Sequence, residues 1–111
     1  MRIISQNGAI DVPYEKCCIW LDENSKCVKL SPIGEPDSNY VFGLYSTEEK
    51  AQKAMEMLRE KYAHMKRVEC FSSLFASNHL DTLSNKEVKM LGDETQKLMC
   101  FQFPQDEDVE V

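Results

Sequence analysis

The sequence predicts an α+β domain, in which a mostly antiparallel sheet of four to six strands carries one main amphipathic helix, at about residues 47–64, on one face. Three observations lead to this prediction. They are an Asn-Gly dipeptide between two short apolar runs, a second pair of runs with matching faces, and one amphipathic segment with a capping signal. Alternating hairpins beside such a helix are typical of the α+β class.

The first hairpin is centred on Asn7-Gly8, because this dipeptide favours a two-residue type I′ turn whose central positions both need positive φ. Pairing outward from the turn places Ile3 opposite Val12. Pro13 cannot donate to a ladder, so the hairpin should end there.

The second hairpin joins residues 16–22 to residues 26–32 through a turn at Asn24-Ser25. A two-residue loop separates an apolar face from a mixed one, and a one-residue slip would invert both, so this register is preferred. The apolar face then holds Cys17, Ile19, Leu21, Val28 and Leu30. The mixed face holds Cys18, Trp20, Asp22, Cys27 and Lys29. A Pro- and Gly-containing loop over residues 31–39 and a strand over residues 39–45 should follow.

The capping box at residues 46–49 predicts the start of the main helix. In this motif the Ser46 hydroxyl would accept a hydrogen bond from the Glu49 backbone N–H. Its apolar positions recur at helical spacing and should meet the apolar face of the second hairpin. They are Ala51, Ala54, Met55, Leu58, Tyr62 and Met65.

Residues 66–97 leave two alternatives open, because no Gly or Pro occurs between Leu44 and Leu91. Residues 66–78 either continue the main helix or form a strand. A second capping box at residues 84–87 predicts a short helix near 84–91, with Gly92 as its stop. A final strand over residues 98–103 would close a single domain at residues 1–104, followed by an acidic tail at 105–111.

Composition limits the function classes. The chain has 111 residues, enough for one domain, and a net charge of −6, which argues against direct binding of nucleic acid. No apolar run approaches the ~20 residues of a membrane span. An odd number of cysteines, five, and the lack of an apolar leader predict the reducing cytoplasm.

Metal chemistry finds no support in the spacing of the ligand-type residues. Cys17 and Cys18 are adjacent, so on a strand they point to opposite faces, and the close pairs that zinc requires do not occur. His64 and His79 are isolated. We expect neither a metal nor a cofactor.

Nucleophilic catalysis finds no motif either. Cys70 with His64 and Asp81, or Cys100 with His79, can be combined on paper. With five thiols and two histidines some such combination always exists. No nucleophile elbow accompanies them, so no catalytic residue is expected.

The remaining candidates are surfaces that bind a partner. Trp20 lies on the mixed face of its hairpin, and Tyr14 and Tyr40 border loops nearby. Tryptophan and tyrosine are common interface anchors, although the helix could instead cover Trp20 as part of the core. The tail is either a frayed terminus or a negative arm that enters a basic groove. Its acidic residues are Asp106, Glu107, Asp108 and Glu110.

Three segments together resemble a known family. They read MRIISQNGAIDVPYE at residues 1–15, YSTEEKAQKAMEMLRE at residues 45–60 and FQFPQDEDVEV at residues 101–111. This combination resembles short, functionally uncharacterised proteins carried by phages and mobile elements of Firmicutes. The resemblance implies a bacterial host cell as the setting and supplies no catalytic residue.

These observations favour a non-enzymatic protein-binding module of a phage or mobile element, such as an inhibitor of a host defence nuclease. It would dock on a host or phage protein with a basic surface. One alternative is a homo-oligomeric accessory protein, for example a homodimer. The other is a small enzyme with a pocket lined by His64 or His79.

Overall fold

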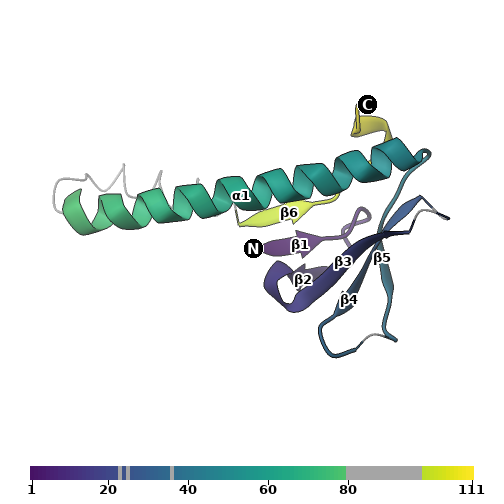
Figure 1. Cartoon of the computed structure of the whole chain (residues 1–111), viewed down its shortest axis with the longest axis horizontal. Coiled ribbons are helices and arrows are strands. Elements are labelled where there is room, and N and C mark those ends of the chain that lie inside the picture. Colours follow the sequence, from purple (N-terminus) through teal and green to yellow (C-terminus); the bar gives the residue numbers. More distant parts are fainter. Residues whose placement is uncertain (23, 25, 36, 80–98) are drawn as a thin grey trace.

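The fold consists of two small sheets and one long helix (Figure 1). A computed structural model describes residues 1–22, 24, 26–35, 37–79 and 99–111, without the side chains of residues 74–79. Its strands are β1 (Arg2–Ile4), β2 (Asp11–Pro13), β3 (Cys17–Asp22), β4 (Cys27–Pro32), β5 (Tyr40–Leu44) and β6 (Cys100–Gln102). Its helices are α1 (Glu48–His79) and the 3₁₀ helices η1 (Tyr14–Lys16) and η3 (Asp106–Asp108).

Both sheets have three strands, in the order β2-β1-β6 for sheet A and β3-β4-β5 for sheet B. All pairings are antiparallel except that of β1 with β6, which is parallel. The α+β class and the mostly antiparallel arrangement are therefore confirmed, and the six strands of the described residues match the predicted number.

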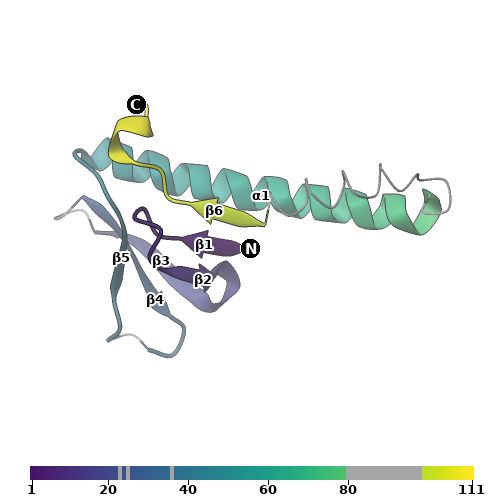
Figure 2. The same ribbon diagram turned by 180° about the vertical axis from the view of Figure 1, so that it is seen from behind.

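The core lies where α1 crosses the two sheets, and the last turns of the helix extend beyond the described strands (Figures 1 and 2). Its buried members come from both sheets, from α1 and from the chain after β6. They are Ile3, Val28, Leu30, Phe42, Tyr45, Ala51, Ala54, Leu58, Phe101, Phe103 and Val109. The predicted contact between the helix stripe and the apolar face of the second hairpin is confirmed, since Ala51 and Leu58 share this cluster with Val28 and Leu30.

The register of the second hairpin is as predicted, with Ile19 opposite Leu30 and Asp22 opposite Cys27. The faces alternate accordingly, because successive strand residues point to opposite sides. Val28 and Leu30 are fully buried, whereas Trp20 is exposed. The turn at Asn24-Ser25 falls partly outside the described residues.

The first hairpin has the predicted register but a different turn. The Gly8 N–H donates to the Ser5 carbonyl at 2.9 Å, so Gln6 and Asn7 are the central residues. Asn7 does not take positive φ, and only Gly8 does, at 75°. The type I′ prediction was therefore wrong. The side-chain oxygen of Asn7 instead accepts from the Ser5 hydroxyl at 2.7 Å, which stabilises the alternative turn.

The helix begins one residue later than its predicted capping box. The Thr47 hydroxyl accepts from the Lys50 N–H at 3.2 Å, so Thr47 is the N-cap and the predicted pairing of Ser46 with Glu49 was wrong. Ser46 faces the C-terminal segment instead, and its N–H and hydroxyl both donate to Asp106.

The far end of α1 settles the alternative left open by the sequence, because the helix continues through residues 66–78 as far as His79, the last residue described before residue 99. The absence of Gly and Pro from this stretch permits the continuation. The short helix predicted near residues 84–91 lies outside the described residues.

Candidate functional site

The outer face of sheet B, on the side away from α1, carries several exposed apolar side chains. Its exposed apolar members are Trp20, Ile33, Val41 and Leu44, with exposed fractions of 36%, 64%, 52% and 59%. The register places Trp20, Val41 and Leu44 on one side, because Trp20 and Val41 both neighbour Lys29, and Leu44 pairs with Cys27. Ile33 follows β4 directly, and its N–H donates to the Lys16 carbonyl beside the end of the β3–β4 ladder. We call these four residues the apolar face.

An ion pair crosses the middle of the apolar face. Lys29 Nζ lies 2.8 Å from an Asp22 carboxylate oxygen, diagonally across β3 and β4. The hydrogen bond to Asp22 raises the pKa of Lys29, so the Lys29 ammonium group remains charged at neutral pH. The surface around Trp20 thus combines apolar area with a fixed polar contact, which is how protein-binding surfaces are commonly built.

A β-bulge separates two neighbours on β5. The register shifts between Val28 and Lys29, so Val41 joins the outer side while Phe42 remains buried. Tyr40 pairs with Leu30 and therefore lies on the other side of sheet B, although it is 44% exposed. Tyr40 and Trp20 thus do not share one surface.

A groove separates β3 and η1 from α1 and has a volume of about 550 Å³. Tyr14, from η1, packs on Tyr62 of α1 with ring centroids 4.5 Å apart. Cys17 and Ile19 line the β3 side of the groove, and Met55 lines the helix side. Burial raises the pKa of Cys17, and its Sγ donates to the Pro13 carbonyl at 3.2 Å, so this thiol is a poor nucleophile.

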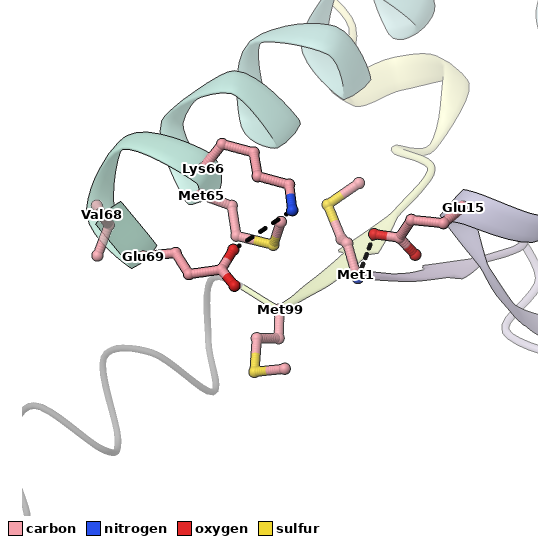
Figure 3. A pocket seen from close by; sticks show the side chains of 7 residues that line it. All are labelled: Met1, Glu15, Met65, Lys66, Val68, Glu69 and Met99. Atoms are coloured by element: carbon pink, nitrogen blue, oxygen red, sulfur yellow. Dashed lines mark hydrogen bonds and ion pairs between the residues drawn. The ribbon is translucent and has the colours of Figure 1, made fainter. Parts of the chain in front are cut away.

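A smaller pocket of about 240 Å³ lies where the N-terminus approaches the middle of α1 (Figure 3). Its walls are mostly apolar and are formed by Met1, Met65, Val68 and Met99. Two ion pairs frame it, one between the Met1 amino group and Glu15 at 3.0 Å and one between Lys66 and Glu69 at 3.5 Å.

The acidic C-terminal segment is folded onto the start of α1. Asp106 accepts from the Ser46 N–H at 2.8 Å and from its hydroxyl at 3.1 Å, and Lys50 Nζ lies 3.6 Å from its carboxylate. The Ser46 N–H bond, followed by the Ser46 hydroxyl and Lys50, lowers the pKa of Asp106. Val109 is buried in the core. The frayed-terminus expectation is therefore wrong for residues 105–109.

The predicted binding residues fall in four separate places. Trp20 lies on the apolar face, Tyr40 lies on the other side of sheet B, Tyr14 lies in the groove, and the acidic segment lies across α1 from sheet B (Figures 1 and 2). Glu107, Asp108 and Glu110 are exposed there, whereas Asp106 is engaged by Ser46 and Lys50. A single surface that is both acidic and aromatic is thus not assembled.

Sequence reasoning missed Ile33, Val41 and Leu44. The alternation of strand side chains between two faces could have placed residues 39–45, but the bulge at Phe42 interrupts this alternation.

Within the described residues no three His, Cys, Asp or Glu side chains are placed to hold a metal ion. His64 lies exposed on α1. None of the described helices has the length and apolar character needed to cross a membrane.

Sequence and structure comparisons add no relative to this picture. No family model matches the chain, and neither a curated protein nor a solved structure matches it.

Proposed function

We propose that the protein is a non-enzymatic protein-binding module of a phage or mobile element and that it docks through the apolar face. The observation that carries this proposal is the exposure of Trp20, Val41 and Leu44 together on one side of sheet B, with the exposed Ile33 directly after β4. Contiguous apolar surface is costly to leave in water, and where it persists it commonly marks an interaction site.

Trp20 is the expected anchor of this docking surface. It stands between Cys18 and Asp22 on the same side of β3, next to the Asp22–Lys29 ion pair. Tryptophan contributes strongly to binding when a partner removes it from water, because it buries a large rigid ring at little cost in conformational entropy.

The chemistry of the partner follows from charge. The net charge of −6 should speed the approach to a basic surface and disfavour an acidic one. A nuclease that normally holds nucleic acid has such a surface, and the resemblance to phage proteins supplies the setting. Inhibition of a host defence nuclease is the specific form of the proposal.

The test uses affinity capture from an extract of a Firmicutes host, followed by calorimetry with the captured protein. Trp20→Ala should weaken binding at least ~30-fold, the loss expected of an interface anchor. Tyr40→Ala is the matched control, since it removes an exposed aromatic ring from the opposite side of the same sheet. Raising the salt concentration should slow association.

Equal affinity of the Trp20→Ala variant and the unmodified chain would exclude the apolar face as the docking surface. Recovery of the chain alone, at both low and moderate salt, would count against a heterologous partner altogether.

A further inference from the structure

The outer edge of β3 carries backbone groups that no other described strand pairs with. The Ile33 N–H donates to the Lys16 carbonyl at 3.0 Å, which fixes the hydrogen-bonding phase of the β3–β4 ladder. Alternate residues of an antiparallel strand direct their backbone groups to opposite edges. The backbone groups of residues 18, 20 and 22 therefore face β4, and those of Cys17, Ile19 and Leu21 face the outer edge. The Cys17 N–H already donates to the Tyr14 carbonyl of η1, so the edge offers the Cys17 carbonyl and both backbone groups of Ile19 and Leu21.

The opposite edge of sheet B is closed. The Gln6 N–H donates to the Phe42 carbonyl at 2.7 Å, and the Gln6 side chain bonds both the N–H and the carbonyl of Leu44, at 3.0 and 3.2 Å. A bulge further interrupts this edge. Both devices are known to prevent edge-to-edge pairing.

β3 has none of these protections. It is six residues long, and its sequence CCIWLD contains no proline, no lysine and no bulge. The edge strands of sheet A are only three residues long, and β2 ends in Pro13. A long, apolar, unprotected edge is a template for another strand.

The sequence of β3 complements itself when two copies run antiparallel. If a two-fold axis passes beside Ile19, each Ile19 faces its own copy, and Lys16 of one chain, the last residue of η1, lies opposite Asp22 of the other. The two Ile19 residues would exchange hydrogen bonds, and the Leu21 N–H of each chain would donate to the Cys17 carbonyl of the other, because the Cys17 N–H is bonded to Tyr14. Opposite charges at both ends favour this register over one shifted by two residues.

The groove beside β3 fits the same partner. Its apolar walls include Cys17 and Ile19 on the strand and Met55 and Tyr62 on the helix. In the proposed pairing Leu21 of the second copy lies opposite Cys17, on the same side of the sheet. Its side chain would enter the groove and cover walls that the single chain leaves open to water.

From this complementarity we infer that the occupant of the β3 edge is a second copy of the chain, joined about a two-fold axis beside Ile19 into one six-stranded sheet. The dimer places the two Trp20 side chains on the same outer surface. The inference does not depend on the proposed function, because it concerns self-association alone.

Sedimentation velocity over a range of protein concentrations tests the stoichiometry. The unmodified chain should sediment as a dimer at high concentration. Lys16→Glu places like charges opposite one another twice per dimer and should raise the dissociation constant roughly tenfold. Arg67→Glu is the matched control, since it makes the same charge change at an exposed site on α1. A monomer at all concentrations, or equal weakening by both variants, overturns the inference.

Disulfide cross-linking tests the register. In the proposed pairing position 20 lies opposite Cys18 of the second copy in a non-hydrogen-bonded pair, with Cα atoms about 4.5 Å apart, which suits a disulfide. Mild oxidation of the Trp20→Cys variant should therefore give a covalent dimer, with positions 18 and 20 linked on peptide mapping. Leu44→Cys introduces a thiol on the same outer face but away from the edge, and should not cross-link. A dimer joined through any other pair of positions, or an edge occupied only by a different protein, contradicts the inference.

Discussion

At the scale of single residues, Gln6 holds together parts of the chain that are distant in sequence. Its amide nitrogen donates to the carbonyls of Leu44 and Pro104, at 3.2 and 3.0 Å, and its amide oxygen accepts from the Leu44 N–H at 3.0 Å. Its own carbonyl accepts from the Gln105 side chain at 2.7 Å. One side chain in a turn thus links sheet A, sheet B and the C-terminal segment.

Gln6→Ala should lower the free energy of unfolding by about 1–3 kcal/mol, because it removes the two hydrogen bonds to the Leu44 backbone and one of the two that the Pro104 carbonyl accepts, the other coming from the Tyr45 hydroxyl. Urea denaturation measures the change. Gln52→Ala provides the control, since Gln52 is exposed on α1 and donates a hydrogen bond to the neighbouring Glu48 side chain one turn away. An equal effect of the two substitutions would show that Gln6 does not connect the two sheets.

At the scale of elements, the second hairpin was predictable and the start of α1 was only partly so. Apolar and mixed positions of residues 17–22 and 27–32 match in one register only, so Ile19 opposite Leu30 followed from the residues themselves. Ser46 and Thr47 are both good caps. The choice between them depends on Asp106, which bonds Ser46 from 60 residues away, and no local pattern reveals that contact.

Contacts between residues that are distant in sequence also explain why the sequence did not predict the docked C-terminal segment or the complete apolar face. Residues 105–111 are strongly acidic and look like a solvated tail, whereas a single apolar residue, Val109, reaches the core. Likewise, the bulge that brings Val41 to the outer side arises from the pairing of β5 with β4 and not from the sequence of β5 alone.

Docking of the C-terminal segment should depend on pH. The pKa of Asp106 lies below its ordinary value of 3.8, so the ionised carboxylate is favoured in the folded state. Its contribution is complete above the unfolded pKa and is lost as the pH falls through the lower, folded pKa. The amide resonance of Ser46 should follow this loss in NMR spectra recorded between about pH 5 and pH 2. Asp106→Asn retains an acceptor oxygen and should abolish the titration, and a persisting titration would assign it to another group.

At the scale of the whole molecule, the C-terminal segment is an integral part of the domain. Removal of residues 105–111 takes away the buried Val109 side chain and the contacts of Asp106 with Ser46 and Lys50. The free energy of unfolding should fall by about 2 kcal/mol or more. Removal of residues 110–111 alone, both exposed, is the matched control and should change little. If the chain without residues 105–111 unfolds at the same urea concentration as the unmodified chain, the segment does not contribute to the stability of the domain.

The pairing of β1 with β6 also bears on how the chain reaches its fold. β6 lies parallel beside β1, and nearby contacts such as that of Gln6 with Pro104 join residues separated by 98 positions. Closing so long a loop costs conformational entropy before any contact compensates for it, so such pairings form late and slowly. Sheet B and α1 come from one continuous stretch and can form first. On a ribosome, β1 would therefore be synthesised before the other described strands and would wait for β6 to complete sheet A.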